Sequence, residues 1–401
     1  MKDNVKVNTI ISNCKDCGKP FEISPNEQKY YKFNNLELPK RCSECRKKRK
    51  KAKQAEEHKK AEEERIRKAE EDERQLHILL KSLPFDQIKL SELEMANPDK
   101  SLVIIGNGFD IIHEVKSSYW DFQNTIGKNS PLRFYMETYL DTSDLWSNLE
   151  DSLGRLNYSM FLNSEVIDMW LENFGAYNPD AQAADFFAAV ETAISPTFEI
   201  PRELGRRFRK WLKTLQVTSS KRPFSMFSGN YKVLSFNYTK FIETLYGAKR
   251  ENICYIHGCR KTPKGCKPDE IILGHKPGIE EEQWDKVEFK PYSFKNSYKR
   301  YIMESAFETA AREASWYDDS TTKKCTDIIK AHSEFFNKLS DIKTIFVIGH
   351  SLSEVDYPYF TEVCNKCDAH WYIGYHSLAD AKRLVEFVKF MGLKNVSVFR
   401  M

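Results

Sequence analysis

Short apolar runs recur between residues 102 and 399, and they constrain the fold of this chain more than any other feature. Several of them are followed by segments of helical length, at 240–246, 353–367 and 378–391. Strand-length runs that alternate with helices are typical of α/β proteins with a parallel sheet. The pattern therefore predicts a doubly wound, mainly parallel sheet with strands at 102–105, 231–236, 253–256, 270–273, 344–348, 371–374 and 396–399.

The rest of the sequence predicts two further parts and one insertion. Residues 1–50 hold closely spaced cysteines, and residues 51–95 form a charged helical connector whose Glu and Lys residues lie at i,i+4 spacing with almost no apolar stripe. We expect the sheet domain to span 96–401. Its stretch from about 130 to 230 has aromatic-rich helical periodicity, which predicts a helical insertion packed over the sheet.

Two cysteine pairs near the N-terminus have the spacing of a zinc site. Cys14 and Cys17 form the first CxxC pair, and Cys42 and Cys45 form the second. Thiolates separated by two residues can turn onto one tetrahedral ion, so two such knuckles complete a four-sulfur site. A module this small buries little apolar surface, and the metal would supply much of its folding free energy. The sequence therefore predicts a zinc ribbon with a structural ion.

A basic segment at 46–53 follows the second cysteine pair directly and leaves two interpretations open. It could bind nucleic acid, because basic runs attract phosphates. It could equally be the solvated start of a helix, in a module that serves as a folding staple or docks a protein. The formal net charge of the whole chain is only +4, so this positive charge is local.

The chain is expected to be cytoplasmic and to have no membrane partner. No run of eighteen apolar residues occurs, and residues 1–5 lack the charged and then apolar layout of a secretion signal. Four of its ten cysteines have metal-ligand spacing, which fits a reducing compartment better than a disulfide framework.

Four of the predicted strands end in residues suited to a ligand at the carboxyl edge of the sheet. Glycines after the first strand would let backbone N–H groups approach a phosphate, and a histidine after another could take a proton near neutral pH. Each feature alone also has a purely structural explanation, as close packing or helix capping. The four segments are 106–110, 236–239, 256–258 and 348–356.

In this order the segments resemble the AbiH family of bacterial abortive-infection proteins and, more distantly, the sirtuin-like NAD-binding fold. The similarity runs from about Leu102 to the C-terminus and includes a Ser-Tyr-Trp-Asp-Phe motif at 118–122. It implies a sirtuin-like, Rossmann-type sheet domain with NAD or a related nucleotide as its ligand.

The resemblance also implies a site. Asn237 falls on the active-site asparagine of sirtuins and His257 on the histidine of their His-Gly pair, so these two are the expected catalytic residues. Thr239 stands where sirtuins have an aspartate that holds the nicotinamide carboxamide. The residues expected to bind the nucleotide are Gly106, Asn107, Gly108, Phe109, Asp110, Asp121, Phe122, Thr239, Gly349, Ser351 and Leu352.

The function implied by the resemblance is an abortive-infection effector that hydrolyses the nicotinamide–ribose bond of NAD when it senses a phage-derived trigger. The zinc module would serve as a sensing, docking or homo-oligomerisation arm, and the helical insertion as a lid. Because Thr239 is neutral, the alternative is a regulator that binds NAD or ADP-ribose without cleaving it, while the zinc module engages nucleic acid or a phage protein. A nuclease ranks last, since the chain lacks the clustered carboxylates of two-metal sites.

Overall fold

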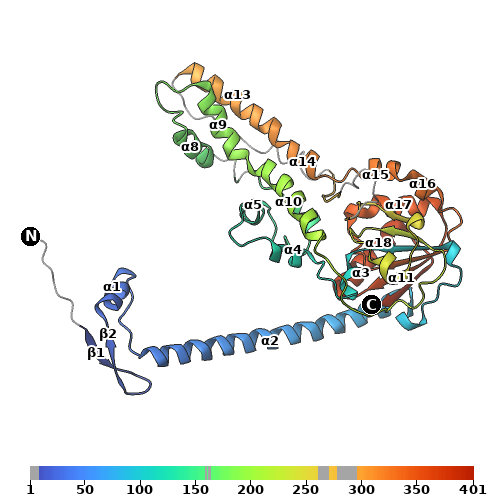
Figure 1. Ribbon diagram of the computed structural model, residues 1–401, viewed down its shortest axis with the longest axis horizontal. Helices are drawn as coiled ribbons and strands as arrows, with labels where there is room; N and C mark the ends of the chain where they lie inside the picture. The colour runs from blue at the N-terminus through green and yellow to red at the C-terminus, as the bar shows by residue number, and fades with distance from the viewer. Residues whose placement is uncertain (1–8, 159, 161–163, 261–270, 278–295) are drawn as a thin grey trace, which may run out of the picture. The chain divides into compact units, whose positions relative to one another are not determined.

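Seven parallel strands form the main sheet of the computed structural model, which describes residues 9–158, 160, 164–260, 271–277 and 296–401 (Figure 1). The inner strand Ser101–Ile105 is buried along its whole length, as expected of a parallel strand covered on both faces. In spatial order the strands are β3 (Asp86–Ile88), β9 (Val396–Arg400), β8 (His370–Tyr375), β7 (Thr344–Ile348), β4 (Ser101–Ile105), β5 (Lys232–Ser235) and β6 (Ile253–Tyr255).

The direction of winding reverses at β4. The chain passes from β4 to β5 and β6 on one side, then returns to β7, β8 and β9 on the other side, with Val103 paired to both Val233 and Phe346. The carboxyl ends of β4 and β7 therefore diverge into loops that lead to opposite sides. Such a point leaves a crevice at the edge of the sheet.

The structure confirms the α/β class and the parallel sheet but differs from the predicted set of strands in two places. Residues 271–273, within the predicted strand at 270–273, lie outside any strand, and Glu270 lies outside the described residues. In their place β3 forms the sheet edge by pairing with β9. The sequence of β3 is Asp-Gln-Ile, too short and too polar to produce an apolar run.

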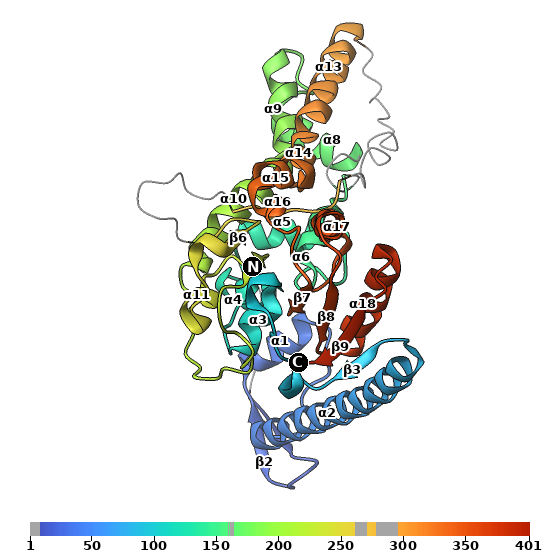
Figure 2. The same cartoon turned by 90° about the vertical axis from the view of Figure 1, so that its right-hand side faces the viewer.

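Helices flank the strands, and α18 lies beside β8 (Figure 2). Its ends follow from the sequence, because Ser377 and Asp380 form a capping box and Gly392 ends the helix in the left-handed conformation. The helices of this layer are α3 (Asn107–Ile112), α4 (Tyr119–Thr125), α11 (Phe241–Tyr246), α15 (Cys325–Ala331), α16 (Ser333–Asn337), α17 (Tyr357–Lys366) and α18 (Leu378–Met391), with short 3-10 turns at Leu90–Glu92, Pro98–Lys100, Arg250–Asn252 and Glu354–Asp356.

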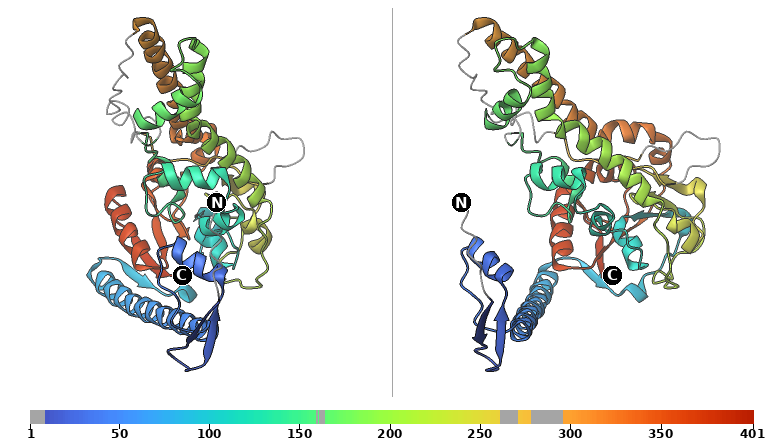
Figure 3. Two further views of the ribbon diagram at one scale, coloured as in Figure 1. Left: turned by 90° about the vertical axis from the view of Figure 1, so that its left-hand side faces the viewer. Right: turned by 60° about the vertical axis from the view of Figure 1, so that its left-hand side comes forward.

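A helical lobe adjoins the sheet and continues its hydrophobic core (Figure 3). The predicted insertion at 130–230 supplies most of it, but a later segment, absent from that prediction, packs against it: α13 lies on α9, and α14 lies on α10. The lobe contains α5 (Pro131–Tyr139), α6 (Leu149–Leu153), α8 (Ser164–Asn173), α9 (Ala183–Ile194), α10 (Pro196–Leu212), α13 (Ser297–Ala314) and α14 (Trp316–Thr321).

The N-terminal unit consists of a hairpin and two helices. Its elements are β1 (Ile10–Asn13), β2 (Pro20–Ile23), α1 (Pro25–Phe33) and α2 (Ser43–Ser82). The chain divides into compact units at 81/82, where α2 ends, rather than near the predicted boundary at 95, because β3 already belongs to the sheet. No helix in the described part of the chain is both long and apolar enough to cross a membrane.

Gly349 fixes the approach of the β7 loop to β4. Its φ is +64°, and a Cβ atom there would overlap the backbone nitrogen of Phe109. We predict that Gly349→Ala lowers the free energy of unfolding by about 3 kcal/mol or more, because backbone atoms must shift. Gly392→Ala is the control, since its φ is +65° with open space around it, and left-handed strain alone costs about 1 kcal/mol. Equal losses in denaturant unfolding would contradict this account of Gly349.

Candidate functional site

The four predicted zinc ligands converge in the N-terminal unit. Cys14 and Cys17 occupy the turn between β1 and β2, and Cys42 and Cys45 lie at the start of α2. Their sulfurs all lie within 4.8 Å of one another, and the sulfurs of Cys17 and Cys42 are 3.8 Å apart. A tetrahedral ion with Zn–S bonds of about 2.3 Å separates its sulfurs by about 3.8 Å. The residues therefore fit zinc.

The protonation of these thiols also fits a shared cation. Hydrogen bonds that the Cys45 thiol donates to Cys42 and Cys17 raise its pKa to about 12, whereas a backbone hydrogen bond at Cys42 lowers the pKa of Cys14 to about 6. When deprotonated as metal ligands, sulfurs this close together would repel one another, and a shared cation would neutralise them. The second pair sits on a helix start rather than in a second hairpin knuckle, which differs from the predicted ribbon.

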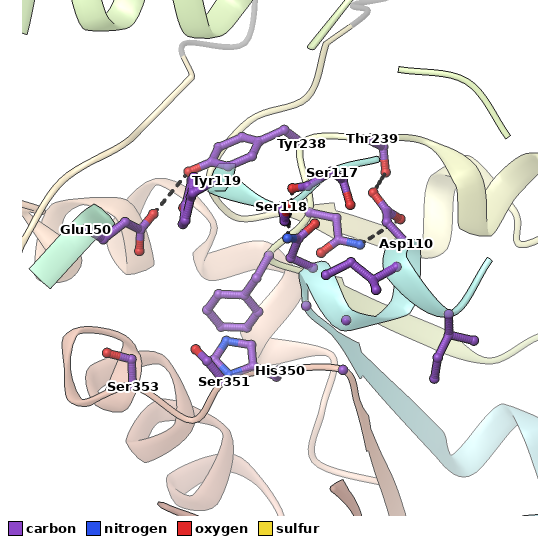
Figure 4. A pocket seen from close by; sticks show the side chains of 18 of the residues that line it. Asp110, Ser117, Ser118, Tyr119, Glu150, Tyr238, Thr239, His350, Ser351 and Ser353 are labelled. Carbon is purple, nitrogen blue, oxygen red and sulfur yellow. Dashed lines mark hydrogen bonds between the residues drawn. The ribbon is translucent and has the colours of Figure 1, made fainter. Parts of the chain in front are cut away.

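A cavity of about 470 Å³ opens at the carboxyl edge of the main sheet, where the winding reverses (Figure 4). Its floor comes from the loops after β4, β5, β6 and β7, and its aromatic wall from α4 and the helical lobe. Nine of the predicted residues line it: Gly106, Asn107, Gly108, Asp110, Asn237, Thr239, His257, Gly349 and Ser351.

The glycines of the first loop pack against the β7 loop. The backbone N–H of Gly106 donates to Ile348 at 3.1 Å, and that of Gly108 donates to Gly349 at 2.7 Å. A Cβ atom on Gly106 would lie 2.6 Å from the Cα of His350. Both amides are therefore occupied within the protein, so these glycines serve close packing rather than the predicted phosphate cradle.

Asp110 organises the loop after β5. Its carboxylate accepts hydrogen bonds from the Asn237 amide at 3.0 Å and the Thr239 hydroxyl at 2.6 Å (Figure 4). Burial raises the pKa of Asp110 to about 7, although both hydrogen bonds oppose this shift. Because the Asn237 nitrogen faces Asp110, its oxygen is left as an acceptor, buried and without a hydrogen-bond partner among the described residues.

His257 is almost fully buried in the cavity floor. Burial, followed by the charge of Lys323, lowers its pKa well below the usual range, so the imidazole is neutral. Its Nε2 lies 3.7 Å from Asp356 and has no hydrogen-bond partner in the described part of the chain. The same carboxylate lies 3.4 Å from Nε2 of His350, whose Nδ1 accepts from the Leu352 amide.

A buried lysine connects the helical lobe to this floor. Lys323 follows α14, is fully buried, and donates to Glu150 at 2.8 Å and to Asp356 at 3.1 Å. Burial opposes the charge of Asp356, but Lys323, together with His350 and His257, outweighs it and holds the pKa of that carboxyl well below its usual range. Burial also opposes the charge on Lys323, yet Asp356 and Glu150 raise its pKa, so the amine stays protonated.

Two tyrosines complete the cavity wall near Glu150. The Tyr238 hydroxyl contacts Glu150 at 3.3 Å and the carbonyl oxygen of Ile272 at 2.7 Å, and Tyr119 lies beside it (Figure 4). Burial raises the pKa of both phenols well above the usual range, and the charge of Glu150 adds to it. Both groups therefore remain neutral hydrogen-bonding groups.

The other four predicted nucleotide-binding residues lie away from the cavity lining. Phe109 and Phe122 are fully buried in the hydrophobic core, and Asp121 accepts from Ser118 in the capping box of α4. Leu352 is buried at a φ of +52°. Their places are explained by packing and helix capping.

The sequence reasoning missed Glu150, Lys323, His350 and Asp356, which surround the cavity or support its floor. His350 and Asp356 belong to the 348–356 segment that was singled out, so their position was a usable signal. Glu150 and Lys323 come from helical segments far apart in the chain. No local spacing links them to each other or to the strand ends.

Comparison with known families finds two matches. The family described as "Bacteriophage abortive infection AbiH" matches residues 102–375, which is more than half of the chain. The family described as "Probable treble clef domain" matches residues 10–54, and this N-terminal region with its four cysteines is a zinc-binding region of that type. No curated protein and no solved structure matches the chain.

We predict that Lys323→Met lowers the free energy of unfolding by about 3–5 kcal/mol at neutral pH, because two buried carboxylates lose their counter-ion. The deficit should shrink as pH falls, since both carboxyls can then become neutral. The neighbouring Lys324 is mostly exposed and lies 3.7 Å from Asp319, so Lys324→Met should change stability little. Denaturant unfolding at several pH values measures both. Equal effects of the two substitutions, or a deficit that grows in acid, would refute the assigned role of Lys323.

Proposed function

Because the chain belongs to the AbiH family of bacteriophage abortive infection proteins, we propose that it acts in phage defence by binding NAD and hydrolysing its nicotinamide–ribose bond. One observation carries the proposal. Asn237 and His257 line a cavity at the reversal of the sheet, and each has a buried polar atom without a hydrogen-bond partner among the described residues.

The order of the strands supports a nucleotide as ligand. From β6 to β9 the order is the 3-2-1-4-5-6 arrangement of Rossmann-type sheets, whose dinucleotides bind where the order reverses. The cavity lies at that point, and its volume is within the range of small-molecule sites, about 300–1,000 Å³. These features support the sirtuin-like, Rossmann-type assignment that the sequence resemblance implied.

The unpartnered polar atoms favour a ligand rich in hydroxyl groups. Asn237 lines the cavity, and because its nitrogen is held by Asp110, its oxygen is left without a partner among the described residues. A buried acceptor left unsatisfied is costly, so a ribose hydroxyl or a water would be bound there. With the amides of Gly106 and Gly108 occupied, the phosphates would be held by hydroxyl groups of the lining, at Ser117, Ser351 and Ser353.

The proposed reaction needs one water and one base. The water oxygen bonds to the anomeric carbon of the ribose as the carbon–nitrogen bond to nicotinamide breaks, and nicotinamide leaves as a neutral ring. His257 is neutral and so can accept the proton that the water loses, while Asp356 stabilises the resulting imidazolium. Asn237 would orient the water or the ribose.

One observation favours the alternative, a regulator that binds NAD or ADP-ribose without cleavage. The carboxylates that line the described cavity are already engaged: Asp110 by Asn237 and Thr239, Glu150 and Asp356 by Lys323, and Asp380 by a helix cap. No carboxylate of the described cavity lining is therefore free to take the role of the aspartate that sirtuins have where this chain has Thr239. Under this alternative, the cavity senses a nucleotide and the zinc module acts on another partner.

We predict that the purified full-length protein binds ADP-ribose and releases nicotinamide from NAD, alone or with lysate of phage-infected cells. Asn237→Ala and His257→Ala should each reduce release by about 100-fold or more. Asn395→Ala and His58→Ala, which remove the same side chains from exposed positions, should not. Calorimetry and a nicotinamide assay measure the two activities. Binding without release in every condition would favour the regulator, and absence of both would reject the proposed ligand.

A further inference from the structure

Four exposed lysines share one side of α2 immediately after the zinc-binding cysteines. Lys47, Lys48, Lys50 and Lys51 form no ion pair with any described residue. At 100° per residue they cover about 160° of the helix surface, and neighbours at i,i+3 and i,i+4 lie side by side. We call these four residues the lysine face.

The other basic residues of this segment lie on the opposite side of the helix and are neutralised. Arg46 pairs with Glu27 at 2.9 Å, and Arg49 lies 3.7 Å from Asp16. Lys53 lies 3.6 Å from Glu57. The unit thus uses one side of α2 for its own ion pairs and leaves the lysine face to an external anion.

The lysine face destabilises the helix that carries it. Like charges at i,i+3 and i,i+4 repel, and they lie near a helix N-terminus, where the helix dipole disfavours positive charge. Residues 9–54 contain 13 Lys and Arg but only 5 Asp and Glu. An anionic polymer would relieve this repulsion and release counterions on binding.

Exposed aromatic rings lie on α1 of the same unit. Tyr30 is 61% exposed and Phe33 is 89% exposed, and Lys29 and Lys32 lie on the same half of that helix. Flat rings beside ammonium groups suit unstacked bases and their phosphates. An anionic membrane fits less well, because α2 has no apolar face between 46 and 60 to insert into lipid.

We propose that the treble-clef unit binds single-stranded nucleic acid, with the lysine face on the phosphates and Tyr30 and Phe33 stacked on bases. Arg46 bonds both Glu27 and Tyr31 of α1 from the side of α2 opposite the lysine face, so a strand that reaches both the lysine face and the rings would wrap around the unit. This activity is independent of the nucleotide proposed for the cavity. It gives the chain a second ligand, through which nucleic acid could act as its trigger.

The first test compares the removal of four positive charges at two different places on α2. The zinc-loaded full-length protein is titrated into a fluorescein-labelled single strand of about 20 nucleotides, long enough for one or two binding units. The test variant is K47Q/K48Q/K50Q/K51Q. The control, K59Q/K60Q/R65Q/K68Q, removes the same charge from a part of α2 where Lys60 and Arg65 already pair with Glu56 and Glu62.

Fluorescence anisotropy, measured over a range of salt concentrations, should distinguish the test variant from the control variant. In the test variant, the magnitude of the slope of log affinity against log salt concentration should fall by about 3. Its affinity should fall roughly 100-fold at about 0.1 M salt. The control should stay within about twofold of the wild type. No binding by the wild type, or equal losses in both variants, would overturn the proposal.

The second test concerns the rings. Tyr30→Ala with Phe33→Ala should weaken binding about tenfold without changing the salt slope, and Phe390→Ala, at an equally exposed ring, should have no effect. Zinc content and circular dichroism confirm that each variant is folded. Tighter binding to a duplex or to anionic phospholipid vesicles than to the single strand would overturn the assignment of the partner.

Discussion

The buried ammonium group of Lys323 is the interaction on which the candidate site depends. It holds Glu150 from the helical lobe and Asp356 from the loop after β7, so two parts of the domain meet at one charge. Through Asp356 it also sets the surroundings of His257 and His350. A buried charge that serves two partners has few alternative positions, because any shift leaves a carboxylate without a counter-ion. The cavity floor is therefore rigid where its chemistry would occur.

The glycines around β4 provide the second constraint. Gly106, Gly108 and Gly349 allow the first loop and the β7 loop to touch at backbone distance. The amides of Gly106 and Gly108 therefore donate to carbonyl oxygens of Ile348 and Gly349. A glycine turn after a first strand would usually be interpreted as a phosphate site. Here it positions Asp110, and Asp110 in turn fixes Asn237 and Thr239. The protein would then recognise the proposed ligand mainly with side chains: one amide oxygen, one neutral imidazole and several hydroxyl groups.

The sequence predicted the features that depend on local patterns. Six strands of the sheet, the charged helix and the four zinc ligands follow from apolar runs, Glu/Lys spacing and CxxC pairs. The rest depends on contacts that spacing does not encode. β3 is polar and short, α13 returns to the lobe from far along the chain, and Lys323 meets Glu150 only in the folded state. Phe109 and Phe122 have motif positions but are buried in the core, because a side chain beside a ligand loop can serve packing instead.

The central claim is that the cavity between the loops of β4 and β7 holds a nucleotide through Asn237 and His257. A crystal structure of the protein grown with ADP-ribose tests it most directly. The account predicts density in this cavity, with ribose hydroxyl groups within hydrogen-bond distance of the Asn237 oxygen and the His257 Nε2. A saturated complex with the ligand bound elsewhere, or with its ribose turned away from both residues, would contradict the account.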